Sequence, residues 1–145
     1  MDVKIKKLNP NAHIPTAGSD KAAGYDLYAC IEEVIEIQPQ KMVKIGTGIA
    51  VTPPKGYFGA IFARSGLATK RGLRPTNCVG ICDEDYIGEY IVGLYNDSNL
   101  VQTVEPGERI AQLVFLPYIS VNMIEVDELE ETERGDGGFG STGTK

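Results

Sequence analysis

A short acidic segment, residues 83–86, combines side chains that could together handle a nucleotide. Asp83 directly follows an apolar predicted strand that contains Val79 and Ile81, and there we expect its carboxylate to be partly buried and held in place. Tyr86 adds a flat, stiff ring beside it. A fixed carboxylate can act as a general base toward water, and an aromatic ring offers a platform for a sugar or nucleobase. The alternative is an ordinary solvated turn, because acidic turns are common.

A second candidate segment, residues 64–72, follows the almost wholly apolar residues 57–63, which predict an internal strand. Arg64, Ser65 and Gly66 open what is predicted to be one short helix. A guanidinium, a hydroxyl and the free N–H groups of a first helical turn suit phosphate binding. An ordinary N-cap at Ser65, with Arg64 in solvent, explains the segment equally well.

The C-terminal residues 134–145 carry a third pattern. Many glycines and few apolar residues are typical of a disordered tail. The segment also suits a flap over a nucleotide, in which Arg134 and backbone N–H groups hold phosphates and Phe139 stacks on a base. It is not a Walker A loop, because Gly140 is followed by Ser141 rather than by lysine.

Three polar residues interrupt predicted strands and need partners. Asp26 stands within residues 22–30, and an arginine or the water shell of a metal ion would explain it. Arg109 and Gln112 lie on the predicted strand 109–116. We expect an ion pair for Arg109 and favour a ligand for Gln112.

The elements that must position these groups are predicted to be strands. The acidic segment should form the tip of a hairpin, residues 77–96. Short apolar or alternating stretches recur along the chain at residues 3–8, 22–30, 34–37, 42–45, 46–51, 57–63, 101–104, 109–116 and 118–126, the last being taken as a core strand. This rhythm is typical of a sandwich, jelly roll or barrel.

Composition fits one domain, because 145 residues with 42% hydrophobic residues can bury a sizeable core. The net charge of -6 and the lack of a basic block argue against binding to nucleic acid. No segment approaches the roughly 18 apolar residues of a membrane span, and residues 1–15 show no signal-peptide pattern. We therefore expect no membrane partner.

The chain has three cysteines, Cys30, Cys78 and Cys82. An odd number without a signal peptide favours reduced thiols and a cytoplasmic location. Cys78 and Cys82 lack a second Cys or His pair, since His13 is the only histidine. Small buried thiols are thus favoured over a zinc site.

Taken in order, five segments resemble the motifs of the trimeric deoxyuridine triphosphatases, the dUTPase family: residues 23–27 (AGYDL), 64–67 (RSGL), 80–89 (GICDEDYIGE), 107–113 (GERIAQL) and 134–143 (RGDGGFGSTG). The resemblance spans nearly the whole chain. It implies an all-β jelly roll of the β-clip type with one short helix and a flexible C-terminal tail. Residues 1–127 would form the jelly-roll domain and residues 128–145 a linker and glycine-rich lid.

The resemblance also implies an activity and an assembly. The enzyme would hydrolyse dUTP to dUMP and pyrophosphate with Mg²⁺ bound to the triphosphate, limiting uracil in DNA and supplying dUMP for dTTP synthesis. It would be a homotrimer whose three sites are shared, with the third motif from a second subunit and the tail from a third.

Site residues follow from the same resemblance. Asp83 would activate the attacking water at the α-phosphorus, and Asp26 would reach the metal through water. The substrate-binding residues would be Arg64, Ser65, Gly66, Asn77, Gly80, Ile81, Cys82, Tyr86, Ile91, Gln112, Arg134, Phe139, Gly140, Ser141 and Thr142. Among these, Tyr86 would pack on deoxyribose and Phe139 on uracil.

Two positions depart from the family pattern: Ala63, where proline is frequent, and Cys82, where isoleucine is frequent. Two rival functions remain at this stage. A dCTP deaminase resembles this fold, but that family carries a glutamate on the strand corresponding to residues 91–96, where this chain has none. An interaction module without catalysis would lack the motif side chains.

Overall fold

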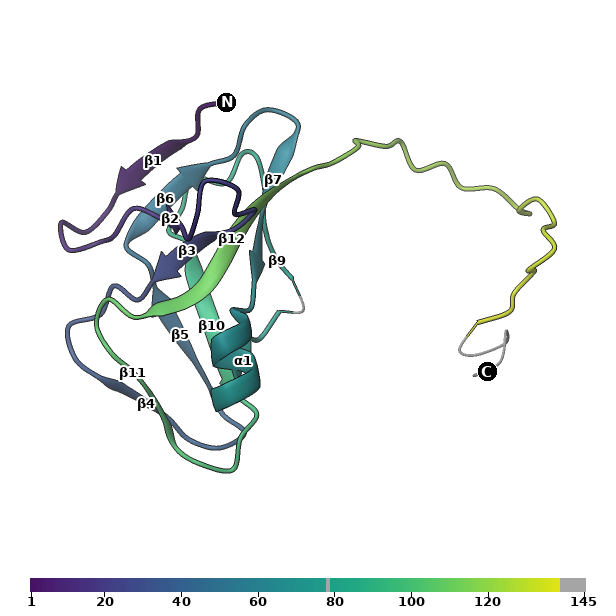
Figure 1. The fold of residues 1–145 in the computed structure, drawn as a ribbon. Helices are drawn as coiled ribbons and strands as arrows, with labels where there is room; N and C mark the ends of the chain where they lie inside the picture. Colours follow the sequence, from purple (N-terminus) through teal and green to yellow (C-terminus); the bar gives the residue numbers. More distant parts are fainter. Residues whose placement is uncertain (78, 139–145) are drawn as a thin grey trace.

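The computed structural model describes residues 1–77 and 79–138, which form β-strands and one short helix, α1 (Ser65–Arg71) (Figure 1). The largest sheet is antiparallel and has the order β2 (Thr16–Ala17), β3 (Tyr25–Tyr28), β12 (Arg109–Pro117), β7 (Tyr57–Phe62) and β9 (Gly80–Cys82). β12, at the centre of this sheet, is the longest strand among the described residues, with nine residues, and β7 beside it has six. The all-β prediction is confirmed.

Three smaller antiparallel sheets complete the body. One has the order β5 (Met42–Gly46), β10 (Ile91–Asn96) and β8 (Leu73–Pro75). The others pair β1 (Lys4–Lys7) with β6 (Ile49–Thr52), and β4 (Ile35–Ile37) with β11 (Gln102–Val104).

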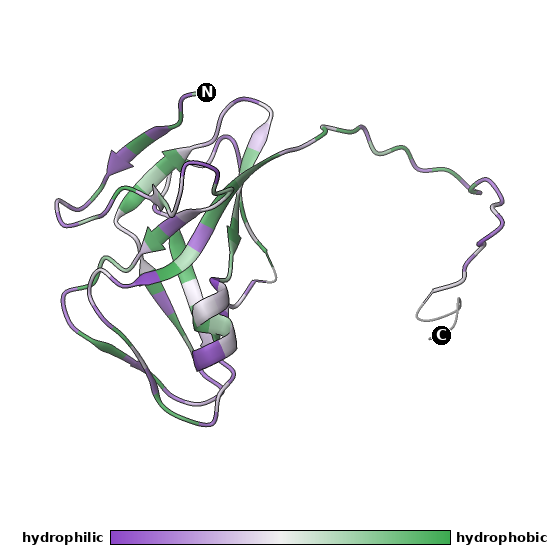
Figure 2. Cartoon of the chain, viewed as in Figure 1, coloured by the Kyte–Doolittle hydropathy of each residue, from purple (hydrophilic) through white to green (hydrophobic). Residues whose placement is uncertain are grey.

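The core lies between these sheets, where alternate side chains of the strands are buried. The strands in Figure 2 carry many hydrophobic positions. On β10, Val92, Leu94 and Asn96 are buried, whereas Ile91 is half exposed. On β12, Ile110, Ala111 and Leu113 are buried. Both strands therefore direct one face to the core and leave the other for polar or ligand contacts.

Helix α1 begins directly after β7 and places the Arg64 to Gly66 segment at the end of the sheet. Its N-cap is Arg64, in an extended conformation with no side-chain cap hydrogen bond. Ser65 is therefore the first helical residue and not the N-cap. The helix ends at Gly72, whose left-handed φ of 67° favours glycine.

The predicted hairpin over residues 77–96 is wrong. Strand β9 pairs with β7, and β10 pairs with β5 and β8, so the two arms belong to different sheets. The acidic segment between them crosses from one sheet to the other. Strand propensity identified both arms, but it carries no information about which strand each arm pairs with.

The predicted core strand over residues 118–126 is also wrong. These residues form an exposed, extended arm that leaves the body after β12 (Figures 1 and 2). Ile119, Met123 and Ile124 are 86%, 87% and 74% exposed. A strand needs a neighbouring strand for its backbone hydrogen bonds, and the described chain offers none here.

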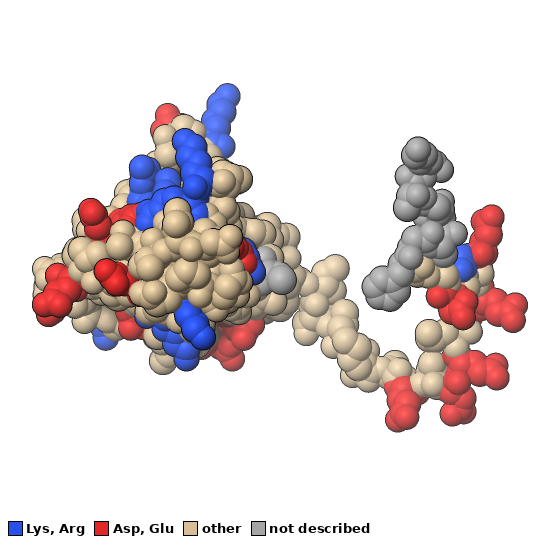
Figure 3. Space-filling model, turned by 90° about the horizontal axis from the view of Figure 1, so that it is seen from below, with Lys and Arg blue, Asp and Glu red and all other residues tan. Residues whose placement is uncertain are grey.

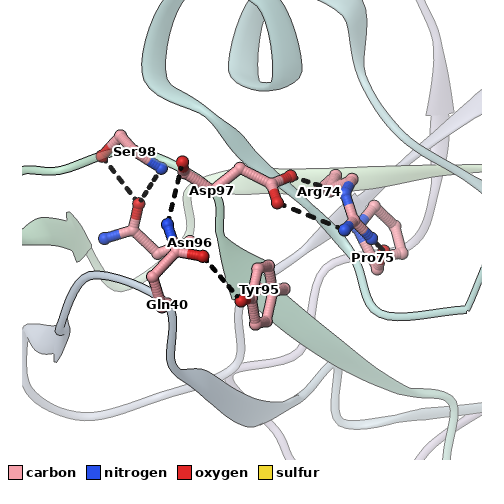
Figure 4. A network of polar contacts seen from close by, with 7 residues as sticks. All are labelled: Gln40, Arg74, Pro75, Tyr95, Asn96, Asp97 and Ser98. Atoms are coloured by element: carbon pink, nitrogen blue, oxygen red, sulfur yellow. Dashed lines mark hydrogen bonds and ion pairs between the residues drawn. The ribbon is translucent and has the colours of Figure 1, made fainter.

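A polar network fixes the corner that follows β10 (Figure 4). Buried Asn96 donates to the carbonyls of Ile37 and Leu100, at 2.8 and 2.7 Å, and accepts from Ser98. Asp97 pairs with Arg74 of β8 at 2.6 Å. Strand β8 is thereby held against β10, which sets the start of the loop that leads to β9.

Candidate active site

The acidic turn begins at Asp83, immediately after β9, and its carboxylate is exposed. The expectation that Asp83 is partly buried is therefore wrong, because β9 ends one residue earlier. The Tyr86 N–H donates to the Asp83 carbonyl at 3.2 Å and closes a tight turn. The Asp83 side chain lines an open cavity of about 600 Å³ together with Phe58 and Ile81. An exposed carboxylate in a fixed turn is accessible to both water and substrate.

Tyr86 is held by two contacts although the residue is 44% exposed. Its hydroxyl donates to the Glu89 carbonyl at 2.9 Å, and its ring lies 6.2 Å from the ring of Tyr90. Gly88 makes room for this arrangement, since a Cβ there would lie 2.5 Å from the Tyr86 hydroxyl. The exposed ring face can therefore serve as a fixed wall for a ligand.

A small cavity of about 100 Å³ lies between β9 and β10. Its lining includes the predicted substrate residues Asn77, Gly80, Ile81, Cys82 and Ile91. The structure thus brings together five of the residues assigned to base recognition. The backbone groups of a strand edge can offer hydrogen bonds to a flat base.

A cluster of charge lies across the sheet, around Asp26 of β3. Asp26 accepts from Arg64 Nε at 2.8 Å and from Arg109 Nη1 at 3.2 Å. The Asp26 side chain is only 14% exposed, whereas those of Arg64 and Arg109 are 26% and 53% exposed. The expected ion pair of Arg109 is confirmed. One carboxylate thus orients two guanidinium groups whose remaining N–H donors can bind anions.

Gln112 and the start of α1 lie close to this cluster. Gln112 is opposite Asp26 in the β3–β12 ladder, and its Nε2 donates to the Ala63 carbonyl at 2.8 Å. Ser65 is exposed, and the space beside Gly66 is open. The anion-binding candidates Arg64, Ser65 and Gly66 are therefore accessible at one end of the sheet.

Only part of the predicted C-terminal flap, residues 134–138, lies within the described residues. Arg134 is exposed and donates from Nε to the Gly137 carbonyl at 2.9 Å, within a turn. Phe139, Gly140, Ser141 and Thr142 lie outside the described residues.

The acidic turn and the arginine cluster of one chain are far apart. Strands β3 and β9 are three positions apart in the sheet, which corresponds to about 14 Å. Asp26 is level with Phe62 of β7, whereas Asp83 continues past Cys82 toward Phe58. This offset adds about 13 Å along the strands. The two groups therefore point to distant regions of the same chain.

The carboxylates of the chain do not by themselves form a metal site. Among residues 1–77 and 79–138, no three His, Cys, Asp or Glu side chains gather to hold an ion. Both oxygens of Asp26 accept from arginines, although each keeps a second lone pair for water. This donor set fits a Mg²⁺ ion held mainly by phosphate oxygens and water.

Sequence reasoning missed one support of the acidic turn. Glu89 accepts the Gly48 N–H at 2.7 Å, which ties the end of the turn to the segment before β6. The glutamate at the end of the third motif was the only signal for this contact. The thiol of Cys82, next to Asp83, is buried as predicted, and burial raises its pKa to about 11, so it stays protonated at neutral pH. Cys78, which was weighed above as a zinc ligand, lies outside the described part of the chain.

Within the described residues, no helix is long and apolar enough to cross a membrane.

Comparison with known proteins agrees with this geometry. A family model described as dUTPase matches residues 10–143. The deoxyuridine 5'-triphosphate nucleotidohydrolase of Nautilia profundicola is 50% identical over 143 residues, which cover 99% of each chain. The protein of the same name from Hydrogenobaculum sp. is 45% identical over 145 residues, which cover 100% of each chain.

Solved structures show the same fold. The dUTPase of Staphylococcus bacteriophage 80alpha with dUPNHPP has a TM-score of 0.84 and 30% identity, covering 99% of each chain. A mutant dUTPase of the S. aureus phage phi11, described with a structural Mg(II) ion, has a TM-score of 0.78 and 25% identity, covering 90% of this chain and 100% of that chain. The predicted jelly roll is therefore confirmed, and the chain belongs to the dUTPase family.

Proposed function

We propose that this protein hydrolyses dUTP to dUMP and pyrophosphate. The observation that carries the proposal is the full-length match to enzymes named deoxyuridine 5'-triphosphate nucleotidohydrolase, at 50% identity for one of them. By removing dUTP, the reaction limits uracil in DNA, and its product supplies dTTP synthesis. Each part of this substrate has a proposed group of residues that would bind it.

Asp83 is the proposed general base. It stands in a rigid turn, is open to water and lines the cavity of about 600 Å³. From this position its carboxylate can orient a water molecule toward the α-phosphorus and take its proton. General-base catalysis of this kind typically contributes 10²–10⁴-fold to the rate.

The base and sugar are proposed to bind beside this turn. Gly80, Ile81 and Cys82 would present backbone groups to uracil, while Asn77 and Ile91 complete the small cavity. The fixed ring of Tyr86 would pack on the deoxyribose and leave no room for a 2′-hydroxyl. Discrimination against cytosine would come from mismatched backbone donors and acceptors.

The triphosphate is proposed to bind at the arginine cluster. Arg64, Ser65, Gly66 and Gln112 are accessible there, and Asp26 holds Arg64 in its orientation. Mg²⁺ would be held by the phosphates and by water hydrogen-bonded to Asp26. The ion would offset phosphate charge during the reaction.

Residues 1–127 are proposed to form the catalytic body, and residues 128–145 the linker and lid. Arg134 would contact the outer phosphates, Gly140, Ser141 and Thr142 would lie beside it, and Phe139 would stack on uracil. Closure would exclude bulk water and align the nucleophile.

The active form is proposed to be a homotrimer with shared sites. Asp83 and Arg64 of one chain point to distant regions, so a single substrate is reached more simply by groups from different copies. The exposed apolar side chains of the arm also need a partner surface (Figure 2). We further place the enzyme in the cytoplasm, where the free thiols of Cys30 and Cys82 stay reduced.

The test is pyrophosphate release from each deoxynucleoside triphosphate and from UTP in the presence of Mg²⁺. We expect turnover of dUTP only. Ammonia release from dCTP would instead indicate a deaminase. Failure to bind any nucleotide, with the fold intact, would indicate an interaction module.

A further inference from the structure

Glu84 makes two contacts that the proposed chemistry does not use. Its Oε2 accepts from the Gly56 N–H at 2.7 Å and from the Tyr118 hydroxyl at 2.8 Å. Gly56 ends the turn between β6 and β7, and Tyr118 is the first residue after β12. The Tyr118 N–H also donates to the Gly56 carbonyl at 3.1 Å. One carboxylate therefore joins the acidic turn, a second turn and the start of the arm.

Both contacts favour a charged acceptor. The Gly56 N–H and then the Tyr118 hydroxyl lower the pKa of Glu84 below its ordinary value of 4.5. The same carboxylate raises the pKa of Tyr118 above its ordinary value of 10.0. At neutral pH the phenol is protonated and the carboxylate ionised, so both bonds are charge-assisted.

The backbone at Gly56 suits this arrangement. Its φ of 78° lies in the left-handed region that favours glycine, and nothing lies within 4 Å of a Cβ built there. The carboxylate of Glu84 thus meets an N–H group in a turn whose conformation is set by the glycine.

Asp83 and Glu84 line the same cavity, together with Tyr118. The Asp83 side chain makes no hydrogen bond within the described residues, so its direction depends on the backbone of the turn. Fixing Glu84 on two sides therefore also limits the movement of its neighbour. A displacement of about 1 Å at a reacting group can lower a rate by as much as about 10²-fold.

We propose that Glu84 is a positioning residue, which together with Gly56 and Tyr118 holds the acidic turn so that the Asp83 carboxylate faces the substrate. This inference rests on the proposed function of Asp83. The Glu84–Tyr118 bond additionally fixes the point at which the arm leaves the body.

The test compares Glu84→Ala, Glu84→Gln and Tyr118→Phe with Glu36→Ala, an exposed acid on β4, as the matched control. With dUTP we expect kcat of Glu84→Ala to fall roughly tenfold while KM changes less than about twofold. We expect a smaller loss of kcat in Tyr118→Phe than in Glu84→Ala. Glu84→Gln should keep a higher kcat than Glu84→Ala, because its amide oxygen still accepts the Gly56 N–H. The control should keep the full rate.

A double variant separates positioning from a general loss of stability. Adding Tyr118→Phe to Glu84→Ala should lower kcat no further, because both changes remove one shared contact. If the two losses multiply, or if Glu84→Ala keeps the wild-type kcat, the positioning role is refuted.

Hydrogen exchange tests the contact without relying on activity. The amides of residues 53–58 and 81–86 should exchange faster in Glu84→Ala and Tyr118→Phe than in the wild type. Unchanged exchange would refute the proposal even if the protein did not act on dUTP. If the wild-type protein releases no pyrophosphate from dUTP but the variants still exchange faster than the wild type, only the proposed function is refuted.

Discussion

At the scale of single residues, the site depends on a few side chains whose directions are set by their neighbours. Asp26 turns two arginines toward open space, and the Tyr86 ring is held by a carbonyl and by Tyr90. Residue types suggested each of these roles. The partners came only from the fold, because Asp26 and Arg109 are 83 positions apart in the chain.

Replacing Asp83 by asparagine should remove the base while keeping the size of the side chain. We expect kcat for dUTP to fall by 10²–10⁴-fold, with substrate affinity nearly unchanged. Stopped-flow pyrophosphate release and binding of a non-hydrolysable analogue would measure both. Asp85→Asn, in the same turn, is the matched control, and equal losses in both variants would contradict the assignment.

Gly88→Ala should displace the Tyr86 ring, because the new Cβ would lie 2.5 Å from its hydroxyl. The ring is the proposed barrier against a 2′-hydroxyl, so the ratio of kcat/KM for dUTP over UTP should fall by roughly tenfold. Gly18→Ala is the control, since nothing lies within 4 Å of a Cβ there. An unchanged ratio would argue that Tyr86 does not select the sugar.

At the scale of elements, the sequence predicted strands well and pairings poorly. Strong patterns, such as those of β7 and β12, were recognised because apolar runs or alternation continued over six and nine residues. The two-residue β2 and three-residue β8 were missed, since such short segments carry too little pattern. Alternation in the arm resembled a core strand, but burial also requires a partner that one chain need not supply.

In the candidate site, likewise, residue types were predicted better than the contacts between distant segments. An arginine was one of the two partners expected for Asp26, and Arg64 makes that ion pair, whereas the position of Gln112 opposite Asp26 was not predicted. They gave no sign that Glu84 contacts Gly56 and Tyr118, because those contacts join segments that lie 28 and 34 positions away in the sequence.

Truncation after Glu133 should separate the body from the lid. Residues 134–138 have no described contact with the core, so the melting temperature should change by less than about 2 °C. Activity on dUTP should fall by at least 10²-fold, since closure is proposed to align the nucleophile. A fully active truncated protein would contradict the lid. Deleting only residues 144–145, which follow the motif, is the control.

At the scale of the whole molecule, acidic and basic groups are unevenly distributed. Five of the seven residues 127–133 are acidic, and this charge gathers on the segment that follows the arm (Figure 3). This acidic linker would carry the proposed phosphate-binding lid, and it would repel a triphosphate unless cations were present. This charge pattern fits an enzyme that takes its nucleotide with Mg²⁺.

Shared sites can be tested by complementation. Asp83→Asn and Arg64→Ala should each be nearly inactive alone, because each removes one half of every site. When the two variants are unfolded and refolded together, random mixing should restore about a quarter of the wild-type sites. Activity of the mixture equal to the sum of the separate variants would mean that each chain builds its own site.

The uncovered arm also has a consequence for the lifetime of the protein. Residues 119–126 are extended and exposed, which is the conformation that proteases cleave most readily. In the proposed homotrimer, partner chains would cover the arm, so proteolysis at the arm should slow as the protein concentration rises. Limited proteolysis over a dilution series would measure the fraction of chains whose arm is uncovered. In the proposed homotrimer, assembly would therefore protect a newly made copy from proteolysis at the arm.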